Sequence, residues 1–247
     1  MRILVTNDDG IDSRGIAALA EAMSDFGEVV VVAPDGNRSA TAHSLTLDRP
    51  LRLRRIKPNW YECSGTPADC VHLALNGTMN SDPPALVASG INRGSNMGQD
   101  ITYSGTVMAA YEATLLGVPS FAVSVSAREK FDYTGAAFYA KKVARYIMDN
   151  GLPKDTLLNL NVPNGPPESV KGLRVTRQGK RFYGDEIVER ADPRGKSYYW
   201  IAGQEQGFDP IDGSDNVAVD EGYASLTPVR FVLTNDEMID RLLKETW

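Results

Sequence analysis

Residues 3–10 read Ile-Leu-Val-Thr-Asn-Asp-Asp-Gly, an apolar run that breaks into a polar turn. Apolar residues then recur at helical spacing over residues 15–26, which predicts an amphipathic helix. Residues 29–33 are continuously apolar and end at Pro34, the pattern of a strand buried on both faces. A strand, a polar turn, a helix and a second buried strand in this order are typical of an α/β fold with a parallel sheet.

The same alternation continues through the first two thirds of the chain. Thr66-Pro67-Ala68-Asp69 has the hydroxyl, proline and acid expected of a helix start, and this helix runs towards Gly77. The further expected elements are a strand at 86–88, a loop at 89–98, a helix at 106–117, a strand at 121–125, a helix at 136–148 and a strand at 157–162. We therefore predict a mostly parallel sheet covered by helices on both sides, in three α/β/α layers.

The pattern changes near residue 171. Expected strands at 173–177, 198–201 and 222–229 are separated by polar, Gly-rich stretches, and residues 234–247 have a helical pattern. We predict one domain over 1–247, with a core of about 1–170 and a β-rich extension of about 171–247 that ends in a helix. The extension serves either to line the site or to make subunit contacts, and the sequence leaves both uses open.

Composition excludes several classes of protein. A net charge of −6 over 247 residues argues against a broad basic surface for nucleic acid, and no apolar run is long enough to span a membrane. Two Cys and two His are too few for a disulfide scaffold or a structural zinc site. The first residues turn acidic too soon for a signal peptide, so we expect a cytoplasmic protein.

Three polar loops follow expected strands: residues 7–10, 35–39 and 89–98. Because ligands bind outside the carboxyl ends of strands in open α/β sheets, all three loops are expected at one edge. Adjacent Asp8 and Asp9 repel each other unless a cation compensates, although a turn and helix-capping cluster explains these residue types equally well. Ser39 and Asn92 favour the metal interpretation, since the set then offers only oxygen ligands, which suit one Mg²⁺ or Mn²⁺.

A second group of polar residues precedes the helix expected from residue 106. Ser104, Gly105 and Thr106 offer hydroxyls and backbone N–H groups at the positive end of that helix, a suitable seat for phosphate. A plain helix cap is the alternative. Asn96, in the preceding Gly-rich loop, adds an amide that can reach the same anion.

Other candidate motifs are weaker. His72 is expected to be structural, and His43 is a lesser candidate for the pocket wall. The dinucleotide pattern G-x-G-x-x-G is missing after the first strand, there is no G-x-S-x-G nucleophile elbow, and Gly195-Lys196-Ser197 lacks the first glycine of a phosphate loop.

The quoted segments together resemble the survival protein SurE family. The matching stretches, in order and over nearly the whole chain, are residues 3–10, 33–39, 65–70, 89–96, 103–107 and 219–223. The resemblance implies a Rossmann-like core and an extension that helps to build homodimers or homotetramers. It also implies a metal-dependent phosphatase that acts on nucleoside 5′- or 3′-monophosphates and, in some members, on short polyphosphate.

Residue by residue, the resemblance makes Asp8, Asp9, Ser39 and Asn92 the metal ligands, and Asn96 with Ser104, Gly105 and Thr106 the phosphate site. A divalent ion would activate water for direct attack, with Asp8 or Asp9 orienting or deprotonating that water. An aspartyl-phosphate intermediate is the mechanistic rival, and a nucleotide- or phosphate-binding sensor without turnover is the functional one. The expected partners are a nucleoside monophosphate and further copies of the chain, with no nucleic acid polymer and no membrane.

Overall fold

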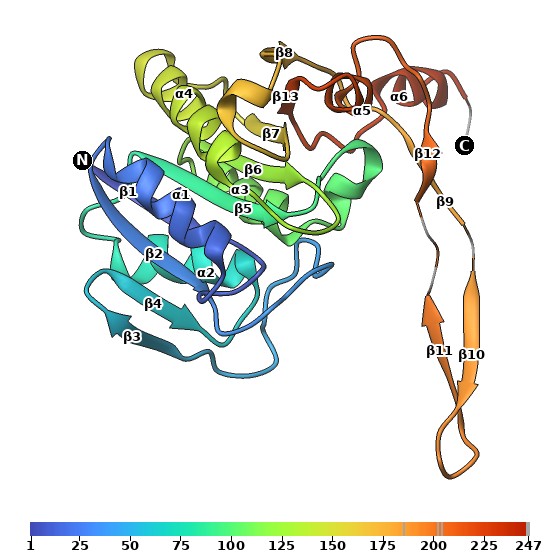
Figure 1. Ribbon diagram of the computed structural model, residues 1–247, viewed down its shortest axis with the longest axis horizontal. Coiled ribbons are helices and arrows are strands. Elements are labelled where there is room, and N and C mark those ends of the chain that lie inside the picture. Colours follow the sequence, from blue (N-terminus) through green and yellow to red (C-terminus); the bar gives the residue numbers. More distant parts are fainter. Residues whose placement is uncertain (185, 202, 204, 246–247) are drawn as a thin grey trace.

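A nine-stranded sheet runs through the middle of the molecule in the computed structural model, which describes residues 1–184, 186–201, 203 and 205–245 (Figure 1). The strand order is β3-β4-β2-β1-β5-β6-β7-β13-β8. The strands span β1 Arg2–Thr6, β2 Glu28–Pro34, β3 Leu53–Lys57, β4 Trp60–Cys63, β5 Leu86–Arg93, β6 Ser120–Ser126, β7 Leu157–Pro163, β8 Leu173–Val175 and β13 Ala224–Val229. Strands β4, β2, β1, β5, β6 and β7 pair in parallel, so the prediction of a mostly parallel sheet is confirmed.

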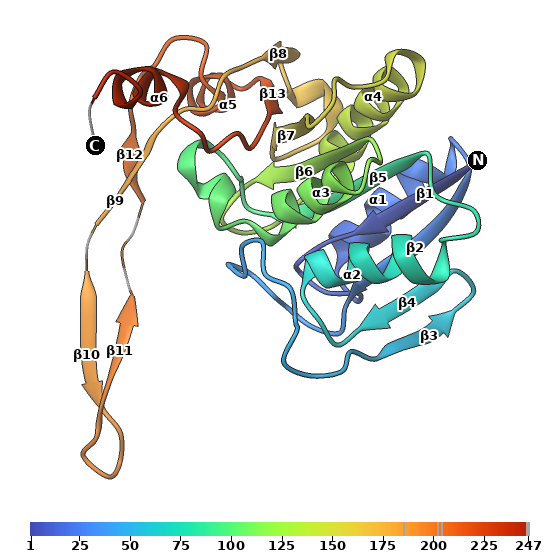
Figure 2. The same cartoon turned by 180° about the vertical axis from the view of Figure 1, so that it is seen from behind.

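Helices cover both faces of this sheet, as predicted. Helix α1, Arg14–Ser24, and helix α4, Thr134–Asn150, pack on one face, while α2, Pro67–Leu73, and α3, Gly105–Leu115, pack on the other (Figures 1 and 2). Alternate residues of β1 serve the two cores, because successive side chains of a strand point to opposite faces. Ile3 and Val5 join the cluster under α1 and α4, whereas Leu4 joins the cluster under α2 and α3.

Element boundaries differ from expectation where local contacts override the pattern. Helix α2 begins at the predicted Thr66 capping box, but it ends at Leu73 and continues as a π-helical turn, Ala74–Thr78. Helix α1 ends before Phe26. Residues 89–93, expected in a loop, extend strand β5 beyond a bulge between Ser89 and Asn92, and bulges are common beside binding sites because they re-aim side chains.

Two strands at the sheet edge, β3 and β4, were not predicted. The β3 segment carries four mostly exposed residues in succession and so shows no alternation of apolar and polar side chains. It pairs antiparallel with β4 at the outer edge of the sheet.

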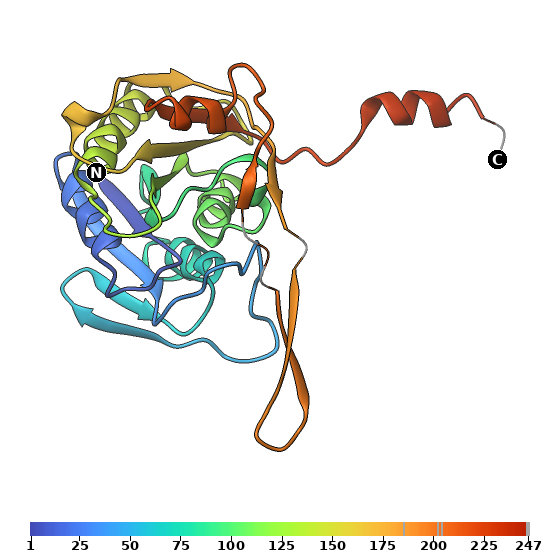
Figure 3. The same ribbon diagram turned by 45° about the vertical axis from the view of Figure 1, so that its right-hand side comes forward.

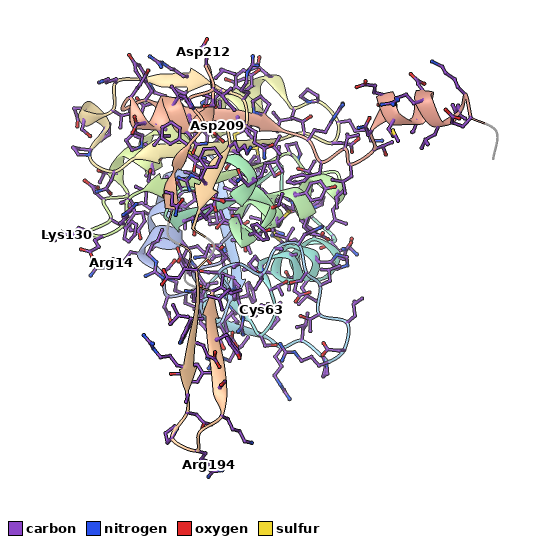
Figure 4. All side chains as sticks on the ribbon, turned by 90° about the vertical axis from the view of Figure 1, so that its right-hand side faces the viewer. Arg14, Cys63, Lys130, Arg194, Asp209 and Asp212 are labelled. Atoms are coloured by element: carbon purple, nitrogen blue, oxygen red, sulfur yellow. The ribbon has the colours of Figure 1, made fainter. Side chains whose placement is uncertain are left out.

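The extension both completes the sheet and leaves it. Strand β13 pairs antiparallel with β7, and β8 pairs with β13. Strand β9, Arg181–Tyr183, pairs with β12, Glu205–Phe208, and beyond them β10, Ile187–Ala191, and β11, Ser197–Ile201, form an arm that points away from the body with Arg194 at its tip (Figures 1 and 4). Strands β9, β10 and β12 were not predicted.

Two helices belong to the extension. Helix α5, Asp215–Asp220, was not predicted, and helix α6, Asp236–Leu242, lies within the expected terminal helix at 234–247 and projects from the body (Figure 3). Residues 246–247 of that expected helix lie outside the described residues. Within the described residues, no helix is long and apolar enough to cross a membrane.

Candidate functional site

The carboxyl ends of β1 and β5 mark the point where the sheet order reverses direction. From β1 the chain moves to β2 on one side, and later to β5 on the other. Such a switch point opens a crevice for ligands. A cavity of about 620 Å³ lies here, and it is lined by the predicted Asp8, Ser39, Asn92, Asn96 and Ser104 together with Ala40, Arg93, Ser95, Gln99, Asp100, Tyr103, Arg181 and Tyr183.

Asp8 is the most buried of the four predicted metal ligands. Its side chain is buried, and its Oδ1 accepts a hydrogen bond from the Thr106 hydroxyl of α3. A side chain at Gly105 would place Cβ 2.8 Å from the Asp8 Cβ, so only glycine leaves room for this carboxylate. Burial raises the pKa of Asp8 to about 6, against the lowering effect of the Thr106 hydrogen bond and with a further rise from Asp9.

The turn that follows β1 is braced from within. The Asn7 side chain donates to the Gly10 carbonyl and the Ser13 hydroxyl, at 3.0 and 2.8 Å, and it accepts from the Gly10 N–H. Gly10 has a φ of +100° and lies against Gly36, where a Cβ would come within 3.0 Å of backbone. The Asn-Asp-Asp-Gly stretch therefore agrees with both interpretations of the sequence, the turn and the ligand site: Asn7 and Gly10 build the turn, and Asp8 lines the cavity.

Asp9 is not among the described residues that line the cavity of Asp8. Its Oδ1 accepts from the Arg93 Nε at 2.9 Å, and its Oδ2 accepts from the Arg93 backbone N–H at 3.1 Å. Asp9 borders a neighbouring cavity of about 490 Å³, whose wall also includes Arg14, Arg93 and Tyr133. The two acids are thus adjacent in sequence but occupy different surroundings.

The remaining predicted ligands of the cavity wall are Ser39 and Asn92, which bring a hydroxyl group and a side-chain amide. The Asn92 Nδ2 donates to the Gly94 carbonyl at 2.8 Å, which turns the Oδ1 atom away from that contact. The Ser39 hydroxyl donates to Asn37 at 2.6 Å. Among the described residues no three His, Cys, Asp or Glu side chains gather in a way that could hold a metal ion. A buried carboxylate with amide and hydroxyl oxygens still fits a hard divalent cation, whose preferred ligands are oxygens.

The second predicted group surrounds the start of α3. The Ser104 side chain caps this helix by accepting from the Val107 N–H at 3.1 Å, so the plain-cap reading of Ser104 holds as well. Ser104 lines the cavity, whereas Gly105 and Thr106 lie behind it against Asp8. The positive end of an 11-residue helix therefore meets the cavity wall.

Asn96 is held firmly by the sheet beneath it. Its backbone N–H donates to Asn161 Oδ1 at 2.8 Å, and its carbonyl accepts from Asn159 and Asn161 at 2.8 and 3.0 Å. Its side-chain amide donates to the Ser124 hydroxyl at 2.9 Å, which uses one of two amide hydrogens. These buried partners fix the loop that carries Asn96 at the cavity wall.

Sequence reasoning missed three charged residues and a tyrosine on the cavity wall. Arg93, Asp100, Arg181 and Tyr183 line it, and the last two come from β9 in the extension. Arg181 donates to Asp100 at 2.9 Å and to Ser95 at 2.7 Å. The extension therefore lines the cavity, which is one of its two expected uses.

Both histidines contact Glu112, and neither is among the described residues that line the cavity. His43 Nε2 lies 2.7 Å and His72 Nδ1 lies 2.9 Å from the two oxygens of the buried Glu112. The structural expectation for His72 fits this contact. In the described part of the chain His43 is not among the lining residues, so its expected place on the pocket wall is wrong: Glu112 holds it against α3 instead.

Comparison with known proteins gives one consistent result. The family model described as "Survival protein SurE" matches residues 3–185. The chain is 52% identical to the 5′-nucleotidase SurE of Syntrophotalea carbinolica, covering 95% of this chain and 93% of that one. It is also 52% identical to the 5′-nucleotidase SurE of Geobacter sulfurreducens, covering 95% and 90%. The crystal structure of the SurE protein from Aquifex aeolicus superposes with a TM-score of 0.88 at 45% identity, covering 99% of this chain and all of the other.

Proposed function

The chain belongs to the survival protein SurE family, and from this premise we propose that it is a phosphoric monoester hydrolase that converts nucleoside 5′-monophosphates to nucleoside and phosphate with the help of one divalent metal ion. The observation that carries the proposal is the buried Asp8 carboxylate beside the start of α3, on the wall of a cavity that also includes Asn92 and Asn96. An unpaired carboxylate beside a phosphate would repel it, so this arrangement favours a cation between them.

Asp8, Asn92 and Ser39 are the residues that would hold the metal, with Asp9 reaching it only if its contact with Arg93 rearranges. When bound, a divalent ion would lower the pKa of a bound water and neutralise charge on the phosphate. Thr106 orients the Asp8 carboxylate by donating to one oxygen, and the space beside Gly105 accommodates the other. Mg²⁺ and Mn²⁺ both suit this oxygen donor set.

The phosphate would rest against the start of α3 and the Asn96 loop. The Ser104 hydroxyl hydrogen is free to donate, because the Oγ atom acts as acceptor in the helix cap. The remaining amide hydrogen of Asn96 is a second donor, held in place by the sheet. Fixed donors of this kind stabilise the charge of the transferring phosphoryl group without reorganisation.

The nucleophile is proposed to be water, with Asp8 rather than Asp9 orienting it. Both Asp9 oxygens already accept from Arg93. Asp8 faces the cavity, and burial favours its protonated form up to a pH of about 6. Trapping of a phosphorylated Asp8 in quenched reactions would instead support the aspartyl-phosphate route.

The test is phosphate release from a panel of nucleoside 5′- and 3′-monophosphates, with Mg²⁺, Mn²⁺ or chelator. We expect metal-dependent release from 5′-monophosphates, lost by at least about a hundredfold in Asp8→Asn, as is usual when a group that holds a catalytic ion is removed. Asp12→Asn is the matched control, because Asp12 is an exposed acid on the wall of the neighbouring cavity. Tight binding of AMP without turnover would support the sensor instead. The panel also decides 3′ activity, and the same assay with short polyphosphate decides polyphosphate activity.

We also propose that the chain assembles into homodimers or homotetramers through the extension. The β11 strand exposes Tyr199, Trp200 and Ile201, with 62%, 64% and 90% of their surface open, and contiguous exposed apolar side chains mark interaction sites. Light scattering after size exclusion tests this, and a monomer at micromolar concentration would contradict it. Fractionation of cells tests the expected cytoplasmic location.

A further inference from the structure

The cavity wall between residues 95 and 100 is held from the extension by one buried cation, Arg181. Only 9% of this side chain is exposed. Its Nη1 donates to Asp100 at 2.9 Å, its Nη2 to Ser95 at 2.7 Å and its Nε to Asn216 at 3.0 Å. Every nitrogen of the guanidinium group therefore already has a protein partner.

Other residues of the extension form hydrogen bonds with the same wall. Gln99 exchanges two hydrogen bonds with the Arg181 backbone, accepting at 2.9 Å and donating at 2.6 Å. The Asp215 carboxylate accepts from the Gly98 N–H at 2.9 Å. The Tyr183 hydroxyl donates to Asp100. The wall thus depends on residues that are more than 75 positions away in the sequence.

The charges on the cavity wall indicate how Arg181 affects the binding of an anionic substrate. Of the residues that the structure describes, four charged side chains line the cavity: Asp8 and Asp100 are acidic, and Arg93 and Arg181 are basic. Arg93 is paired with Asp9, so Arg181 is the partner that neutralises Asp100. Without Arg181, a carboxylate would face a cavity that must accept a dianionic phosphate monoester, and like charges in a partly buried site repel strongly.

We propose that Arg181 is a positioning residue for substrate binding, which acts through Asp100 by neutralising the charge that this carboxylate presents to the cavity. Arg181 does not serve as a direct phosphate ligand, because its donors are already used by Asp100, Ser95 and Asn216. The inference rests on the proposed function, since it concerns the binding of a phosphate monoester.

The test compares Arg181→Met with Arg181→Met/Asp100→Asn, in steady-state kinetics with AMP and Mn²⁺. We expect the single variant to raise KM about tenfold with kcat within about threefold, as for the loss of one charge beside a bound anion. The double variant should return KM to within about threefold of the parent, because the carboxylate left facing the cavity is gone. Glu205, which lies 3.5 Å from the Arg181 Nε, also loses this partner, but it is not among the described residues that line the cavity. Arg174→Met is the matched control: it removes an exposed arginine of the extension that pairs with Glu221, and it should change neither constant.

Three further measurements keep the test decisive. Asp100→Asn alone removes a negative charge from the wall and leaves Arg181 in place, so it should lower KM. Arg181→Lys keeps a positive charge, so it should raise KM less than Arg181→Met, and it replaces the methionine variant in the comparison if that variant folds poorly. The Mn²⁺ dissociation constant of Arg181→Met should stay within about twofold of the parent, since Asp8, Ser39 and Asn92 are not its partners. An unchanged KM in Arg181→Met, or a raised KM that Asp100→Asn does not restore, would overturn the inference.

Failure of the proposed function has a different signature. In that case the parent protein itself would release no phosphate from AMP. Calorimetric binding of inorganic phosphate in the presence of Mn²⁺ then replaces KM as the readout, with the same ranking of variants expected.

Discussion

Replacement of Thr106 by valine removes one hydrogen bond from the buried Asp8 carboxylate while keeping the volume of the side chain. A hydrogen bond to a charged group is worth about 1 to 1.5 kcal/mol more than one to a neutral group, which corresponds to a rise of about 1 in pKa. The pKa of Asp8, which burial already raises to about 6, should therefore move to about 7. A divalent ion must displace the proton from Asp8 to bind, so its affinity follows the ionised fraction.

The consequence is a pH-dependent loss of metal affinity. The ionised fraction at pH 6 should fall about fivefold in Thr106→Val, against about twofold at pH 7 and almost no change at pH 8. Titration of Mn²⁺ followed by electron paramagnetic resonance at these three pH values measures the effect. Thr114→Val, on the same helix but bonded to Ala110 and Ser120, is the matched control and should show the parent profile. A loss of affinity of equal size at all three pH values would refute the reasoning, because it would mean that Thr106 does not act on the proton of Asp8.

Three further changes give predictions about stability. Without metal, Asp8 binds more protons in the folded state than in the unfolded one, because its folded pKa of about 6 exceeds the ordinary aspartate value of 3.8. The metal-free protein should therefore lose stability as pH rises from about 4 to 6, and Asp8→Asn should regain up to about 3 kcal/mol at pH 7 in urea unfolding. Gly105→Ala would force Cβ to within 2.8 Å of Asp8 and 3.1 Å of Pro67. We expect the free energy of unfolding, measured by thermal unfolding, to fall by about 1 to 3 kcal/mol, and Mn²⁺ binding to weaken. An unchanged melting temperature would show that the start of α3 can shift. Glu112 accepts hydrogen bonds from His43 and His72, which hold its pKa below the ordinary value against the effect of burial. This stabilisation is present near neutral pH and is lost as pH falls through the folded pKa of Glu112. Glu112→Gln should therefore destabilise the protein by about 1 to 3 kcal/mol at pH 7 and by less at acidic pH.

Much of the candidate site was accessible from local sequence because parallel topology orders it. Asp8 lies two residues beyond the end of β1, Ser39 lies beyond β2, and Asn92 is the next-to-last residue of β5. Since parallel neighbouring strands end at the same sheet edge, the polar residues that follow them converge without any knowledge of side-chain contacts. The residue roles at this site stay predictions until metal and substrate binding are measured.

The different surroundings of Asp8 and Asp9 could not be predicted in this way. The pair occupies one turn, and turn residues of the same type carry the same local signal. Arg93, 84 positions away, occupies both oxygens of Asp9, whereas Thr106 contacts only Asp8. The difference in role follows from contacts at long range and not from the dipeptide itself.

The amino-acid order alone was enough for the layered core, because buried strands and amphipathic helices repeat periodicities of 2.0 and 3.6 residues that any local window reveals. It was also enough for the edge of the sheet where polar loops collect. Folding in three dimensions was needed to bring Arg181 and Tyr183 of β9 to the cavity, beside Ser95 and Asp100. Strand β9 is three residues long and lacks a periodic pattern, so its place depends on pairing with distant β12 and on the partners that Arg181 finds.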